Sequence, residues 1–91
     1  MKTKAVLSVT GKDNVGIIAK VSAICAEYGA NIIDISQTVL KDYFAMIMIV
    51  EIDKLTVAFT EFADLVSAYG KDNGLEIHAM HEDIFDSMHK I

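Results

Sequence analysis

Two stripes of apolar residues with identical helical spacing are the feature that most constrains this 91-residue chain. In each stripe apolar side chains recur at offsets of 0, 1, 4, 7, 8 and 11 residues, and a glycine follows the final tyrosine. This period puts the side chains on one side of a helix, facing a core. The second stripe begins 41 positions after the first, so the chain repeats one unit. The stripes are Ile17, Ile18, Val21, Ile24, Cys25 and Tyr28, and Ala58, Phe59, Phe62, Leu65, Val66 and Tyr69.

Extended segments flank both predicted helices. Alternating or β-branched apolar residues indicate four strands, at 4–10, 31–40, 43–52 and 75–80. A two-residue connection, Lys41-Asp42, joins the middle two strands as a hairpin. Gly29 is placed to end the first helix, and Thr56 is placed to cap the second.

The resulting order βαββαβ predicts an α+β, ferredoxin-like fold. Right-handed crossovers place both helices on one face of a four-stranded antiparallel sheet. We expect residues 1–81 to form this domain and residues 82–91 to form a short amphipathic helical tail.

The composition argues against several classes of partner. The net charge is −5, and all eight basic residues are lysines. Without arginine the chain lacks bidentate contacts to phosphates or guanine, which disfavours nucleic-acid and membrane-surface binding. The single Cys25 excludes an internal disulfide and fits a reducing compartment. No apolar run reaches the length of a membrane span or a signal-peptide core, so we expect a cytoplasmic protein.

No set of residues indicates catalysis, a metal or a cofactor. His81-Glu82 begins like a zinc-protease motif, but Phe85 stands where the second histidine is needed. On a strand His78 and His81 point to opposite faces, and Cys25 belongs to a core stripe. The sequence therefore favours a protein that is not an enzyme.

The connection from the first strand to the first helix differs from its counterpart in the repeat. Gly11 and Gly16 bracket it, and Asp13 or Asn14 can cap the helix, whereas residues 53–57 contain no glycine. The asymmetry suggests backbone that must approach something closely at the first connection alone. A helix N-terminus there attracts carboxylates and phosphates. The alternative is a plain turn with an N-cap.

Three stretches resemble the ACT domain: Gly11 to Ala19, Tyr28 to Ile32, and Asp34 to Thr38. More narrowly, they resemble the stand-alone ACT proteins of the UPF0237 group, which are similar to repressor-type regulators of the glycine cleavage system. The resemblance covers the chain to about Met80. It implies a small ligand-sensing module with the βαββαβ order.

The resemblance also implies an amino-acid site. In amino-acid-binding ACT domains the first strand–helix loop and an asparagine opening the second strand hold the ligand. Here those positions are Gly11, Asp13, Gly16 and Asn31.

Physical chemistry gives these positions roles. The helix N-terminus from Asn14 onward can hold a carboxylate, Asp13 can receive an ammonium group, and Asn31 can read either. Asp34 is close enough in sequence to line the same pocket, or it is a solvated strand residue. Asn31 has a second interpretation too, as a residue that tolerates positive φ after the helix end.

The third strand is apolar on both sides, although helices cover only one face of the sheet. Residues 43–50 on the helix-free face, with Ile84, Phe85, Met88 and Ile91 of the tail, therefore predict a homodimer contact. ACT-like domains commonly pair, with ligands at the shared boundary. The alternative is a monomer whose own tail covers this face.

These observations favour a regulatory ACT module without catalytic activity that binds a small molecule, most simply an amino acid, and serves a regulated partner protein. The alternative is a ligand-free subunit for dimerisation or protein interaction.

Overall fold

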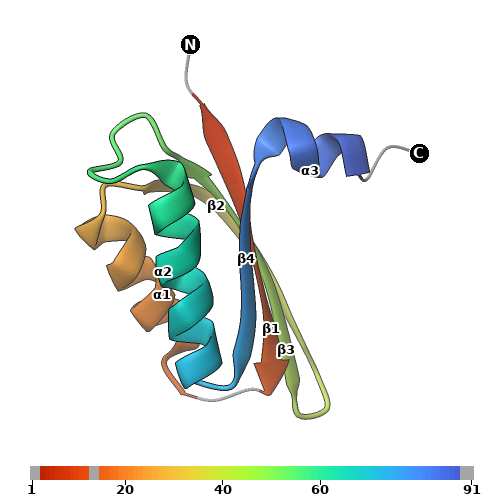
Figure 1. Ribbon diagram of the computed structural model, residues 1–91. Coiled ribbons are helices and arrows are strands. Elements are labelled where there is room, and N and C mark those ends of the chain that lie inside the picture. Colours follow the sequence, from red (N-terminus) through yellow and green to blue (C-terminus); the bar gives the residue numbers. More distant parts are fainter. Residues whose placement is uncertain (1–2, 13–14, 89–91) are drawn as a thin grey trace.

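The computed structural model describes residues 3–12 and 15–88, and Figure 1 shows the arrangement of its elements. Their order confirms the predicted βαββαβ pattern, followed by a short helix. The elements are β1 (Lys4–Lys12), α1 (Ile17–Glu27), β2 (Asn31–Leu40), β3 (Tyr43–Glu51), α2 (Phe59–Asp72), β4 (Leu75–His81) and α3 (Glu82–Met88).

The four strands form one sheet in the order β2-β3-β1-β4, and each neighbouring pair is antiparallel. Two antiparallel steps separate β1 from β2, so these two strands run in the same direction. Helices α1 and α2 cover one face, and α3 lies on the other face, at the end of the sheet near the N-terminus (Figure 1). This is the predicted ferredoxin-like architecture, with β2 and β4 at the edges of the sheet.

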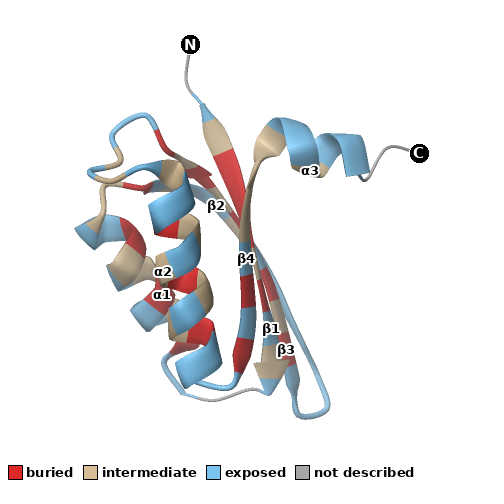
Figure 2. Cartoon of the chain, in the orientation of Figure 1, coloured by how far each residue is buried: buried red, intermediate tan, exposed pale blue. Residues whose placement is uncertain are grey.

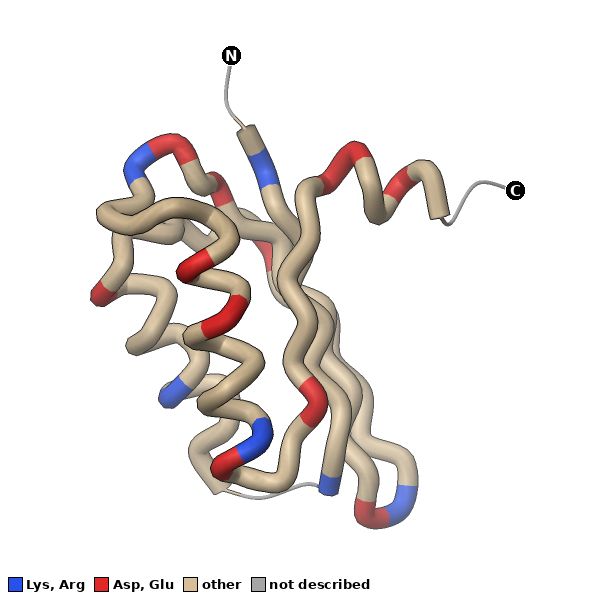
Figure 3. The backbone as a smooth tube through the Cα atoms, viewed as in Figure 1, with Lys and Arg blue, Asp and Glu red and all other residues tan. Residues whose placement is uncertain are grey.

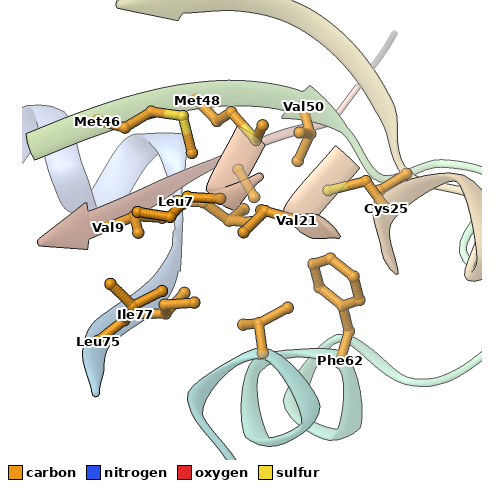
Figure 4. Close-up of a cluster of buried hydrophobic side chains, with 14 of the residues drawn as sticks. Leu7, Val9, Val21, Cys25, Met46, Met48, Val50, Phe62, Leu75 and Ile77 are labelled. Atoms are coloured by element: carbon orange, nitrogen blue, oxygen red, sulfur yellow. The ribbon is translucent and has the colours of Figure 1, made fainter. Parts of the chain in front are cut away.

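The core lies between the sheet and the two helices (Figures 2 and 4). Alternate residues of β1 and β3 point into it, as their periodicity predicts. Cys25 and Phe62, from the centres of the two stripes, are completely buried beneath the helices. Side chains of β1 and β3 in this core include Leu7, Val9, Met46, Met48 and Val50.

The start of α2 differs from the prediction. The helix begins at Phe59 with Ala58 as its N-cap residue, so the proposed Thr56 cap was wrong. Instead Thr56 contacts the end of α1: its N–H donates to the carbonyl oxygen of Tyr28 at 2.9 Å, and its hydroxyl donates to the same oxygen at 3.4 Å. Because both polar groups of Thr56 bond to the end of α1, they do not cap α2.

The two Tyr-Gly pairs also have different outcomes. Gly29 follows the C-cap residue Tyr28 with φ of 82°, as predicted for a helix end. Gly70 lies inside α2, which continues to Asp72. A Cβ atom on Gly70 would lie 2.8 Å from the carbonyl oxygen of Leu75, so this glycine allows β4 to approach the helix.

The helix-free face of the sheet carries the second apolar side of β3, as predicted. Ile47 is 42% exposed there, whereas its neighbours Met46 and Met48 are buried on the helix side. In the part of the chain that the structure describes, no helix is long and apolar enough to cross a membrane.

Candidate ligand-binding site

The N-terminus of α1 begins at a glycine that has open space around it. Gly16 is its N-cap residue in a left-handed conformation, with φ of 87°, and a Cβ atom there would meet nothing within 4 Å. The N–H of Lys20 donates to the carbonyl oxygen of Gly16 at 3.0 Å, which starts the helical ladder. The preceding amide groups have no partner inside the helix. Among the described residues no side chain caps them, and the first turn carries no acidic residue.

These amide groups border a hollow of about 420 Å³ between α1 and the end of β2. Its volume lies within the range of small-molecule sites. The first-turn N–H groups, which no described side chain caps, and the positive end of the helix dipole favour a carboxylate or a phosphate. The lining residues are Gly16, Ile17, Ile18, Ala19, Gln37, Thr38, Val39 and Phe44.

Gly11 has a structural reason to be glycine. A Cβ atom at this position would lie 2.9 Å from the carbonyl oxygen of Gly74 and 2.7 Å from a methyl carbon of Leu75. The close approach that the sequence indicated is therefore an approach of β4. Asp13 and Asn14, predicted to cap the helix and to bind ligand, lie outside the described residues.

Asn31 lies at the opposite end of the sheet from Gly11 and Gly16. It pairs in register with Glu51, which pairs with Lys4 at the beginning of β1, whereas Gly11 pairs with Phe44 near the hairpin. The length of β2 separates the two ends, about 30 Å at about 3.3 Å per residue. Within one chain, Asn31 and the Gly16 hollow are therefore separate sites.

The surroundings of Asn31 are polar and exposed. Its side-chain Nδ2 donates to Oε1 of Glu51 at 3.1 Å. A second hollow, of about 210 Å³, lies beside it and is lined by Gly29, Asn31, Glu51, Asp53 and Lys54. Among the described residues Lys41 is the only non-glycine with positive φ, so the interpretation of Asn31 as a positive-φ residue was wrong.

Asp34 stands apart from both hollows. It pairs with Ile49 next to an irregularity in β2, which places it on the helix-free face. Its Oδ1 atom accepts the N–H of Ile35 at 2.9 Å, and its side chain is exposed. The solvated-residue interpretation describes Asp34 better than a position in the α1 hollow.

The sequence analysis did not identify Gln37, Thr38 and Phe44 as lining residues. Strand direction contained a usable signal. Because β1 and β2 are joined through α1 and run parallel, their C-terminal ends lie at the same end of the sheet. The N-terminus of α1 lies at this end too. The end of β2, rather than its beginning at Asn31, is therefore beside the first connection.

Away from the α1 hollow, the titratable groups that the structure describes form no second candidate site. His78 forms a 3.1 Å contact with Glu76 on the helix-free face, whereas His81 packs on the ring of Phe59 from α2, so the predicted opposite orientation is confirmed. Burial raises the pKa of the Cys25 thiol to about 11, which keeps it protonated. Across residues 3–12 and 15–88, no three His, Cys, Asp or Glu side chains are grouped to hold a metal ion.

A split βαβ sheet with a ligand-sized hollow at its first helix defines a small ligand-binding module. The ACT domain family model matches residues 3–79, and the chain belongs to that family, whose members are regulatory, ligand-binding modules. Relatives that it matches over nearly their whole length are UPF0237 proteins. One from Listeria monocytogenes (serotype 4b, strain F2365) is 46% identical over 88 residues, covering 97% of this chain and 99% of the relative.

Solved structures agree with this assignment. An ACT domain protein from Streptococcus pneumoniae superposes with a TM-score of 0.81 at 41% identity, covering 94% of this chain and 97% of that one. A protein provisionally named a glycine cleavage system transcriptional repressor superposes with a TM-score of 0.74 at 19% identity. That match covers 89% of this chain and 46% of the other, and it shows a shared fold.

Proposed function

We propose that this ACT module binds an α-amino acid without catalysing a reaction, and that the N-terminus of α1 holds the ligand's carboxylate. The observation that carries the proposal is the hollow of about 420 Å³ bordered by the first turn of α1, which no side chain of the described residues caps. Free N–H groups aligned with the helix dipole are suited to an anion. Asp13, which lies outside the described residues, is our candidate acceptor for the ammonium group.

A site that also includes Asn31 needs two chains. Strand β2 is a ten-residue edge strand, and exposed apolar side chains lie along it at Ile33, Val39 and Leu40. Antiparallel pairing of two β2 strands about a twofold axis places the partner's Asn31 near the end of β2 that borders the α1 hollow. Such a homodimer would hold one ligand at each end of the shared boundary.

The decisive experiment places a carboxylate where the ligand's carboxylate is expected. Ala19 is the third residue of α1 and is exposed, so Ala19→Glu fills the helix N-terminus with its own charge. We expect the fold to gain about 0.3–1 kcal/mol while amino-acid binding weakens at least tenfold. Ala23→Glu, one turn further along the same exposed side, is the matched control and should change neither quantity appreciably.

The ligand is found by a thermal-shift screen of the twenty amino acids, and its affinity is measured by calorimetry. A ligand at a hundred times its Kd adds about 2.7 kcal/mol to the free energy of unfolding. Equal affinity in wild type and Ala19→Glu would exclude the helix N-terminus as the carboxylate site.

Asn31→Ala tests the two-chain arrangement. Because Asn31 is exposed and its hydrogen bond to Glu51 lies at the surface, we expect little loss of stability but weaker amino-acid binding. If the affinity is unchanged while Ala19→Glu abolishes binding, the ligand occupies the α1 hollow of a single chain.

The second candidate function is a ligand-free interaction subunit. Exposed apolar side chains gather at the same end of the molecule, where Val15 is 97% exposed, Leu40 is 73% exposed and Tyr43 is 61% exposed. A partner protein that covers them would also cover the hollow. The absence of a thermal shift with every amino acid would favour this function. In either function we place the protein in the cytoplasm, because its free, buried Cys25 fits a reducing compartment.

A further inference from the structure

Val39 is an apolar residue on the side of the sheet that faces the helices, yet the chain leaves it open. In the register of β2 with β3 it pairs with Phe44, and paired residues of neighbouring strands point to the same face. Phe44 is 5% exposed, whereas Val39 is 53% exposed. Nearer the start of β2, Ile32 and Ile35 point to the same face and pack against the core. The cover that the chain gives this side of β2 therefore stops before Val39.

The open side chain of Val39 borders the α1 hollow. Phe44 lines the same hollow from β3, and Ile18 lines it from α1. Polar groups on its border include the first-turn N–H groups of α1 and the amide of Gln37, which pairs with Met46 and so points to the same side as Val39. The hollow thus combines polar groups with an apolar wall.

The lining of the hollow carries no charge among the residues that the structure describes. Its main segments, residues 16–19 and 37–39, are tan in Figure 3, and the next charges after β2 are Lys41 and Asp42 in the turn of the hairpin. A charged group that leaves water needs a partner to compensate its lost hydration. The N–H groups of α1 can compensate a carboxylate, but the described lining offers no opposite charge to a ligand side chain.

We propose that the α1 hollow selects amino acids whose side chains are apolar and uncharged, and that Val39 and Phe44 contact the ligand side chain. This inference rests on the proposed function, which places the ligand's α-carboxylate at the first turn of α1. With the carboxylate held there, the apolar wall remains for the side chain. Covering the exposed surface of Val39 then favours binding.

Pairs of amino acids with similar shape and different charge test this selectivity by calorimetry. Leucine and aspartate share a branched outline, and norleucine and ornithine share a linear one. We expect leucine to bind at least tenfold more tightly than aspartate, and norleucine at least tenfold more tightly than ornithine. Alanine lacks the methyl groups that would contact Val39 and Phe44, so it should also bind at least tenfold more weakly than leucine.

A lysine at position 39 should change the preference. Because Val39 is more than half exposed, Val39→Lys should fold normally by circular dichroism. Its ammonium group offers a partner to an acidic side chain, so we expect the ratio of aspartate affinity to leucine affinity to rise at least tenfold. Ala68→Lys adds the same charge at an exposed position of α2 and should leave this ratio unchanged.

The selectivity and the α1 site fail in different ways. If aspartate or ornithine binds as tightly as its uncharged counterpart while Ala19→Glu still weakens binding, the selectivity is wrong and the site stands. If wild type binds none of the twenty amino acids, the proposed function is wrong and the selectivity falls with it.

The role of Val39 has its own contrary outcomes. An unchanged affinity ratio in Val39→Lys would show that this residue does not contact the ligand side chain. Equal weakening of every amino acid, together with a change of oligomeric state in analytical ultracentrifugation, would show that Val39 contacts a second chain instead.

Discussion

The two strand-to-helix connections of the repeat have opposite designs. Helix α2 carries Glu61 as the third residue of its first turn, whereas the third residue of α1 is Ala19. A carboxylate at this position compensates the positive end of the helix dipole. Thus α2 supplies its own anion, and α1 leaves the corresponding position open beside a hollow.

The connection before α2 is also closed by packing. The carbonyl oxygen of Lys54 lies directly against Gly29, and the N–H of Thr56 donates to Tyr28. The carboxylate of Asp53 accepts the N–H of Thr3 at 2.9 and 3.0 Å. These contacts fix the C-terminal end of α1, while its N-terminal end borders the hollow.

This difference shows how one repeated unit can serve two purposes. The closed connection holds the helices in place, and the open connection presents first-turn amide groups that no described side chain caps. If the open end is a ligand site, its residues should tolerate substitution without loss of fold, and those of the closed end should not.

Glycine substitutions should give the largest contrast. At Gly29 a Cβ atom would collide with the backbone of Lys54, and φ is 82°, so we expect Gly29→Ala to cost about 3–5 kcal/mol. At Gly16 φ is 87° but the space is open, so Gly16→Ala should cost only about 1–2 kcal/mol. Urea denaturation measures both.

Gly74→Ala is the matched control for Gly16→Ala, because Gly74 also combines positive φ with open space. If Gly29→Ala does not fold, it should be missing from the soluble fraction while Gly16→Ala and Gly74→Ala remain in it. That result also ranks Gly29→Ala as the most destabilising of the three. Equal costs at Gly29 and Gly16 would remove the distinction between the two connections.

The thiol of Cys25 tests whether the closed end of α1 stays closed at high pH. Burial raises its pKa from 9.0 to about 11, so the folded state binds this proton more tightly than the unfolded state. The stabilisation is complete below pH 9 and is lost as the pH rises from 9 to 11. Across that range the stability advantage of wild type over Cys25→Ala should shrink by about 2 kcal/mol. A constant difference would mean that the end of α1 opens locally and lets the thiol ionise.

The fold was predictable because its signals are local and repeated. Each helical stripe predicts one helix, each alternating segment predicts one strand, and Gly29 predicts the end of α1. The right-handed crossover rule then determines how these elements combine. Gly70 follows a tyrosine as Gly29 does, but its role depends on the contact with Leu75. That contact joins two elements and leaves no periodic signal in the sequence.

The candidate site was less predictable for the same reason. Gly16 and the helix N-terminus follow from local pattern, whereas Gln37, Thr38 and Phe44 join the hollow through strand direction and register. Asn31 was grouped with the loop by resemblance, although it lies at the other end of β2. A pattern in one chain cannot show which residues a second chain would bring together.

Removing the carboxylate at the closed helix end should have a modest effect. We expect Glu61→Gln to lower the free energy of unfolding by about 0.3–1 kcal/mol, because α2 loses its compensating charge. Amino-acid affinity should not change, since Glu61 belongs to the other connection. Thermal unfolding at low and high salt checks the electrostatic origin, because screening should reduce the loss. A loss of affinity equal to that of Ala19→Glu would contradict the separation of the two helix ends.

The smallest expected effect is at Thr56. Replacing a helix-capping threonine by alanine lowers the free energy of unfolding by about 1 kcal/mol. Here the hydroxyl makes only a 3.4 Å contact with the carbonyl oxygen of Tyr28, which also receives the stronger 2.9 Å bond from the backbone N–H of Thr56. Thr56→Ala keeps that backbone bond, so we expect a loss of about 0.3 kcal/mol in urea denaturation. A loss of about 1 kcal/mol or more would show that the hydroxyl, rather than the backbone bond, closes this connection.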